Sequence, residues 1–185
     1  MTLTTTKASW QIKGSAILHE LVTLMGLSDA ERVALKELKG QANTQASKMT
    51  EDFYARLFRH DPTAEYLQGA SMERLHTMVG EWFTDLFQGV YDEAYVQKRL
   101  GIGHIHVRIG LPVRYPLAML DVVMAHGEVI AKTGSDTELA IGAFRKVLAL
   151  DVAIFNQAYE DNQLEHLAGL VGGERLARLL LSGKA

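Results

Sequence analysis

Apolar residues at helical spacing are the feature that most constrains the fold of this chain. Leu75, Val79 and Phe83 recur at intervals of four residues, and Met78 and Trp82 repeat that spacing beside them. Such intervals place side chains on one face of an α-helix. No stretch alternates apolar and polar residues between turn residues, as a half-buried strand would. The pattern predicts an all-α protein of about six to eight helices.

Capping residues and prolines mark where these helices begin and end. The spacing of Ser28 and Glu31 has the form of a capping box. Other residues that can cap a following helix are Ser71, Asp92 and Asp136. The prolines lie where helices start or stop: Pro62, Pro112 and Pro116. The longest apolar pattern predicts a helix over residues 136–165.

Composition and motifs exclude several classes of protein. The 185 residues suit one domain, and none is cysteine, which rules out disulfides and thiolate chemistry. A formal net charge of −3 lacks the basic surface of a nucleic-acid-binding protein. There is no H-E-x-x-H, G-x-S-x-G or Walker motif, no secretory signal and no membrane-length apolar run. We therefore expect a cytoplasmic protein, without nucleic-acid or membrane partners, whose chemistry depends on His, Tyr, Ser, carboxylates or a cofactor.

His106 has the most unusual neighbours among the seven histidines. Two residues apart on a helix, His104 and His106 point about 200° apart and cannot share a metal. The residues one turn away from His106 are two isoleucines and two glycines, which together make a flat apolar face: Ile102, Gly103, Ile109 and Gly110. Such a face would accept a planar macrocycle ligated by the imidazole. The simpler interpretation from spacing alone is a core histidine bonded to a backbone carbonyl.

Tyr54 is a second polar group in an apolar setting. Its neighbours one turn later are Leu57 and Phe58, so the phenol can bring a hydrogen-bond donor into an apolar pocket. An ordinary core tyrosine with a backbone partner is the simpler interpretation. The stripe that includes Leu75 and Trp82 leaves a similar choice between plain core and one wall of a cofactor cavity.

A longer motif resembles that of a known family. The run His106-Val107-Arg108-Ile109-Gly110-Leu111-Pro112 resembles the H-x-R-I-G-[LI]-P signature of the globin-coupled sensors, protoglobin-like haem modules of bacterial signalling proteins. Glu51-x-Phe53-Tyr54, the later Asp61-Pro62 and Gln97-Lys98-Arg99 are also similar to that family. The family often places Trp-Tyr after the signature, but here Tyr115-Pro116 occupies those positions. A switching role of that second aromatic residue therefore does not transfer to this chain.

The resemblance implies a globin fold with an extra N-terminal helix, a shortened distal region and haem b as cofactor. It makes His106 the iron ligand and Tyr54 the distal hydrogen-bond donor to a diatomic gas, O2 or else CO or NO. It also implies a set of further residues around the haem: Phe53, Leu75, Met78, Val79, Ile102, Gly103, Ile109 and Tyr115.

The implied function is that of a regulatory gas sensor and not of an enzyme. In the family, such a module forms a homodimer through its last two long helices and controls an output domain, such as a diguanylate cyclase or a histidine kinase. The chain has no output-domain motif. The expected organisation is an extension with a pre-globin helix over residues 1–27, the sensor globin domain over 28–165, and a docked helix or linker stub over 166–185.

Two alternatives remain beside the sensor. One is a stand-alone globin with O2 or NO redox chemistry, for which His76 is the candidate distal base. The other is a haem-free globin-like interaction module. Relatives of that second kind generally lack the proximal histidine, whereas His106 is present here.

Overall fold

The protein is an assembly of helices, as the spacing of its apolar residues predicts. The computed structural model describes residues 8–14 and 16–183, and every regular element within them is a helix. In chain order these are η1 (Ala8–Gln11), α1 (Ala16–Met25), α2 (Asp29–Glu37), α3 (Lys39–Phe58), α4 (Asp61–Ala64), η2 (Glu65–Leu67), α5 (Met72–Asp85), α6 (Glu93–Arg108), α7 (Arg114–Ala118), α8 (Leu120–Ala131), α9 (Thr137–Val171) and α10 (Glu174–Leu181).

The predicted capping residues do cap their helices. Ser28 and Glu31 form a complete capping box at the start of α2. The Asp136 carboxylate accepts the Leu139 amide at 3.0 Å and so starts α9. Equivalent side-chain caps begin α5 and α6, at Ser71 and Asp92. Each cap satisfies an amide that the first helical turn leaves without a partner.

The helices are more numerous than predicted, because two short helices that contain prolines, α4 and α7, accompany the longer ones. The described residues contain ten α-helices, against the expected about six to eight. Pro62 starts the four-residue α4, and Pro116 lies in the five-residue α7. In contrast, α9 is longer than predicted and ends at Gly172, whose φ of 81° is left-handed.

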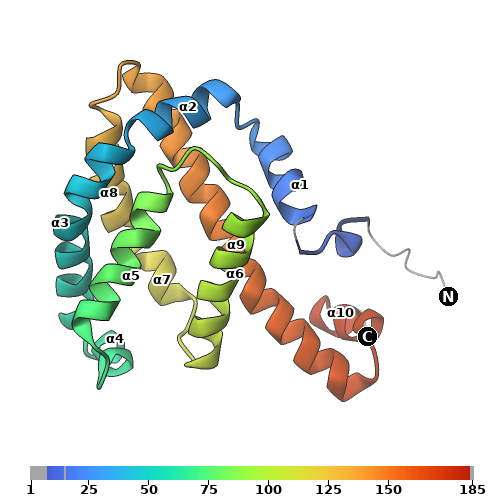
Figure 1. Ribbon diagram of the computed structural model, residues 1–185. Helices are drawn as coiled ribbons and strands as arrows, with labels where there is room; N and C mark the ends of the chain where they lie inside the picture. Colours follow the sequence, from blue (N-terminus) through green and yellow to red (C-terminus); the bar gives the residue numbers. More distant parts are fainter. Residues whose placement is uncertain (1–7, 15, 184–185) are drawn as a thin grey trace.

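Helix α9 runs through the whole molecule and organises it (Figure 1). Helices α2 and α8 pack near its first half, α3 lies on the outer side of α8, and α6 lies along the middle of α9 in the most extensive helix–helix contact of the fold. The hydrophobic core surrounds the first half of α9, where Phe87 stacks on Phe144 with ring centroids 5.3 Å apart. The space between α3, α5, α6 and the middle of α9 is walled by side chains and remains hollow.

The last helix folds back on α9 instead of continuing away from it. Helix α10 packs against α9 and buries Ala177 completely. Lys13, near the other end of the chain, reaches Glu174 at the start of α10 at 2.6 Å. Residues 174–181 therefore form a helix that lies against α9. Among the described residues, no helix combines the length and the apolar character needed to cross a membrane.

Candidate functional site

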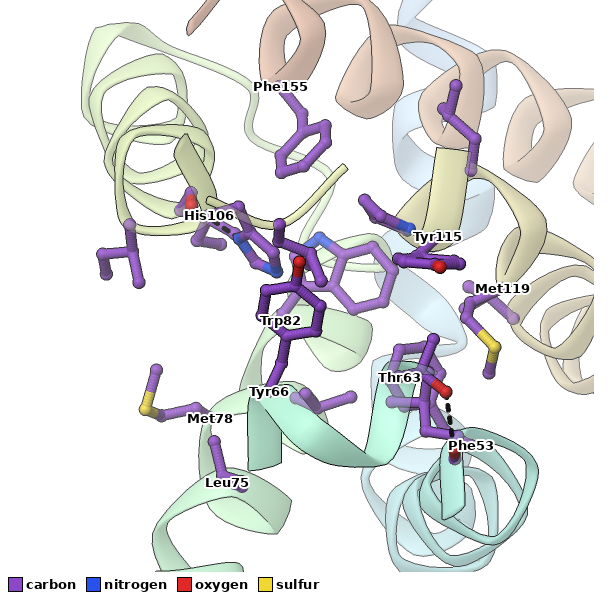
Figure 2. A pocket seen from close by; sticks show the side chains of 18 of the residues that line it. Phe53, Thr63, Tyr66, Leu75, Met78, Trp82, His106, Tyr115, Met119 and Phe155 are labelled. Carbon is purple, nitrogen blue, oxygen red and sulfur yellow. Dashed lines mark hydrogen bonds between the residues drawn. The ribbon is translucent and has the colours of Figure 1, made fainter. Parts of the chain in front are cut away.

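A cavity of about 260 Å³ opens between α3, α5, α6 and α9, and its lining is mainly apolar. The structure brings nine of the ten sequence-predicted site residues to its walls: Phe53, Tyr54, Leu75, Met78, Val79, Ile102, His106, Ile109 and Tyr115. Residues far apart in the chain thus surround one space, as Figure 2 shows. The sequence stripe around Leu75 and Trp82 is therefore a cavity wall.

His106 presents one ring nitrogen to this cavity (Figure 2). Its Nδ1 lies 2.8 Å from the carbonyl oxygen of Ile102, and a carbonyl can only accept, so Nδ1 carries the proton. The ring of Phe155 packs edge-on against the imidazole, with centroids 5.3 Å apart. Burial lowers the pKa of His106, although the bond to Ile102 opposes that shift. The imidazole is therefore neutral and oriented, with Nε2 available as a ligand.

Tyr54 stands on the wall formed by α3 and α5. Its hydroxyl donates to the backbone carbonyl of Leu75 at 3.1 Å, and its side chain is almost fully buried. Burial raises the pKa of Tyr54 to about 12. The phenol is therefore neutral at physiological pH, and its proton can rotate about the C–O bond toward another acceptor in the cavity.

His76, the candidate distal base of the redox alternative, is absent from the cavity lining. Its Nδ1 lies 2.9 Å from the Thr50 hydroxyl, and its ring packs on Tyr54 at a centroid distance of 4.7 Å. Thr50 already donates to the Ser47 carbonyl at 2.8 Å, so it accepts the proton of His76 Nδ1. The imidazole therefore packs on the Tyr54 ring from outside the cavity.

Gly103 is the predicted site residue that the cavity does not include. It faces α9, where a Cβ at this position would lie 2.6 Å from Ala158 Cβ and 2.7 Å from the Phe155 carbonyl oxygen. Real Cβ atoms do not approach other atoms so closely. The expectation that Gly103 lets a cofactor approach α6 was wrong, because this glycine faces α9 and lets that helix approach instead.

The cavity opens to solvent along a margin of apolar side chains. Met78, Ile105 and Ile109 all line it and are 39%, 40% and 48% exposed. Large apolar side chains gathered at an opening are typical of a surface that another apolar group covers. A flat macrocycle inserted edge-first, with His106 at one face, would cover them. The residues present therefore fit a haem.

A buried polar network forms the inner end of the cavity, and the sequence analysis did not assign it. Arg99 is fully buried, and its Nε donates to the Asp151 carboxylate. Tyr95 Oη and Trp82 Nε1 donate to the same carboxylate at 2.6 and 2.8 Å. Burial disfavours the charged guanidinium, but Asp151, Tyr95 and Asp85 together outweigh that effect and raise the pKa of Arg99. The available signal was Asp151 itself, a charge inside the apolar pattern of the longest helix.

Comparison with known proteins agrees with this geometry. The family model described as Protoglobin matches residues 15–165. The chain belongs to the protoglobin family. Membership of a globin family implies haem binding, and the resemblance carried by the His106 motif is confirmed.

Two solved globin domains share this fold. The globin domain of the Geobacter sulfurreducens globin-coupled sensor is 27% identical, with a TM-score of 0.71 over 76% of this chain and 96% of that one. The ferric globin domain of E. coli DosC has the same fold, with a TM-score of 0.64 at 16% identity over 77% of this chain and 99% of that one. The predicted globin fold is therefore confirmed.

Proposed function

We propose that this protein is a haem-based gas sensor that binds O2 and regulates a signalling output domain. The observation that carries the proposal is the imidazole of His106, whose Nδ1 is held by Ile102 while Nε2 faces an apolar cavity. The bond to Ile102 is the one that the simpler interpretation of the sequence predicts. That interpretation does not account for the apolar cavity beside the other ring nitrogen.

The lining residues would hold haem b mainly by apolar contact. Ile102 and Phe155 lie on the side of His106, and Leu75, Met78 and Val79 come from the other wall. Bound haem would supply an iron atom that can bind a diatomic gas. The apolar side chains of the cavity would exclude water from the bound gas and so slow oxidation of the iron.

Tyr54 would donate a hydrogen bond to the gas. Its proton now goes to the Leu75 carbonyl, so a gas ligand competes with that carbonyl for the same donor. A neutral hydrogen bond contributes about 1 kcal/mol, which corresponds to several-fold in affinity. Because O2 takes up more negative charge than CO at iron, the phenol favours O2 over CO, with NO as the other candidate.

The sensor role is supported by the likeness to a globin domain of a globin-coupled sensor. We propose a homodimer through α8 and α9, the last two long helices. Exposed apolar side chains on α8 support this, with Met124 39% and Val129 56% exposed. We further propose that residues 28–165 form the sensor globin domain, with 1–27 as its extension and 166–185 leading toward an output domain such as a diguanylate cyclase or histidine kinase.

Absorption spectroscopy of the purified chain tests the cofactor and its ligand together. We expect a Soret band that shifts when O2 or CO is added to the reduced protein. His106→Ala should abolish haem binding, and His104→Ala, on an exposed residue two positions away, should not. Equal haem retention in both variants would contradict the assignment, and sustained NADH-linked consumption of NO would favour the redox alternative.

A further inference from the structure

A continuous hydrogen-bonded path leads from the backbone of His106 to helix α9. The Leu111 amide donates to the His106 carbonyl at 3.0 Å. The carbonyl of the same Leu111 accepts from the Tyr159 hydroxyl at 2.9 Å. Leu111 therefore bonds to His106 through its amide and to Tyr159 of α9 through its carbonyl. Pro112 restricts the backbone that follows it.

The side chains provide a second path over the same distance. Phe155 lies one turn before Tyr159 on α9, and its ring packs on both the His106 imidazole and the Tyr159 ring, at centroid distances of 5.3 and 5.5 Å. Helix α9 thus contacts the imidazole through Phe155 and the segment that follows α6 through Tyr159. A displacement of His106 reaches α9 by both paths.

A second tyrosine holds the same loop from a different element, η2. Tyr66, from η2, donates to the Gly110 carbonyl at 3.2 Å. The Gly110 amide is bonded to Val107 and not to His106. Tyr66 and Tyr159 therefore make the same kind of bond to consecutive carbonyls, but only the bond of Tyr159 joins the His106 segment to α9.

We propose that Tyr159 is a positioning residue that couples the state of His106 to helix α9. The inference rests on the proposed function, in which ligation at iron displaces the imidazole. Gly103 brings α6 close to the backbone of α9 at Phe155, so a movement of α6 acts directly on α9. The Leu111 peptide therefore passes the movement of the end of α6 to Tyr159. Helix α9 is the element that then changes its packing.

Hydrogen–deuterium exchange of the haem-loaded chain tests the coupling. We compare the reduced protein with and without CO and follow peptides that cover residues 150–165. In the wild type, CO should change the exchange of this part of α9. Tyr159→Phe removes the hydrogen-bonded path and leaves the ring contacts of Phe155, so it should reduce that change by at most about fivefold, the factor for one neutral hydrogen bond. The matched variant Tyr66→Phe should leave it as in the wild type.

Three results would overturn the coupling role. These are no CO-linked change in α9 of the wild type, the same change in Tyr159→Phe, or an equal loss in both variants. Loss of the Soret band in the wild type would instead overturn the proposed function itself, so the two failures are distinct.

The haem-free protein gives a readout that is independent of haem loading in the variants. There, Tyr159→Phe should speed exchange of the Leu111 amide, measured by NMR, and Tyr66→Phe should not. Equal rates in the two variants would also refute the coupling role.

Discussion

The two walls of the cavity are built by different kinds of interaction. On the wall of α6 and α9, buried side chains join the two helices, with Asp151 of α9 accepting from Arg99 and Tyr95 of α6. On the wall of α3 and α5, Trp82 also reaches Asp151, but the rest of the lining is mainly apolar and Tyr54 makes a single bond to a carbonyl. Polar networks specify one arrangement, whereas apolar contacts tolerate small shifts.

This difference suits a ligand-binding module. The wall that carries His106 is held by this network, so in the proposed sensor a displacement of the imidazole would act on both α6 and α9. The opposite wall has Met78 partly exposed at the opening and, away from Trp82, only apolar contacts and the Tyr54 bond, so it would adjust more easily to a cofactor and a gas. Substitutions in the rigid wall should therefore affect stability most, and substitutions in the apolar wall should affect ligand kinetics.

The largest effect is expected for Arg99→Ala, because it leaves the Asp151 carboxylate buried without its ionic partner. Removing one member of a buried ion pair costs about 3–5 kcal/mol of unfolding free energy. Urea unfolding of the haem-free protein measures this cost. The control is Lys98→Ala, which removes the neighbouring, half-exposed cation from Asp85 and should cost less than about 1 kcal/mol. Equal costs for the two variants would contradict the special rigidity of this wall.

Gly103→Ala should be the next largest, because its Cβ would overlap Ala158 and the backbone of Phe155. Overpacking of this kind costs about 1–3 kcal/mol. Gly101→Ala, on the same helix with nothing within 4 Å of the new Cβ, should instead stabilise by roughly 0.5–1 kcal/mol. Thermal unfolding measures both. A higher melting temperature for both variants would show that α6 and α9 can separate without cost.

The same glycine shows how far the sequence could predict this site. Motif and spacing located His106 and Tyr54, because helical periodicity determines which residues share a face. They could not determine which of two buried faces of α6 meets α9, and so Gly103 was assigned to the wrong one. The partners of Asp151 were unpredictable for the same reason, since Trp82 lies 69 residues away in the chain. Contacts between distant segments depend on the crossing of helices, which no local pattern records.

Tyr54→Phe tests the apolar wall, and its expected effect is smaller. The variant keeps the ring but removes the donor now bonded to Leu75. Loss of one neutral hydrogen bond to O2, about 1 kcal/mol, should speed O2 release several-fold. CO release should change less. Stopped-flow measurement of both gases gives the comparison, and an unchanged rate of O2 release would refute the role of Tyr54 as donor.

The smallest effect concerns the pH dependence of stability on the His106 side. Burial lowers the pKa of His106 from its ordinary value of 6.5, so as pH falls through that value the unfolded chain binds a proton that the folded chain refuses. The contribution of His106 to stability is therefore fully present above this pH and declines below it, until the folded-state pKa is reached. Urea midpoints of the haem-free protein at pH 7.5 and 5.5 should differ more for the wild type than for His106→Gln, which does not titrate. An identical pH dependence would mean that the imidazole is protonated as easily in the cavity as in water. The neutral, oriented Nε2 on which iron ligation depends would then lack support.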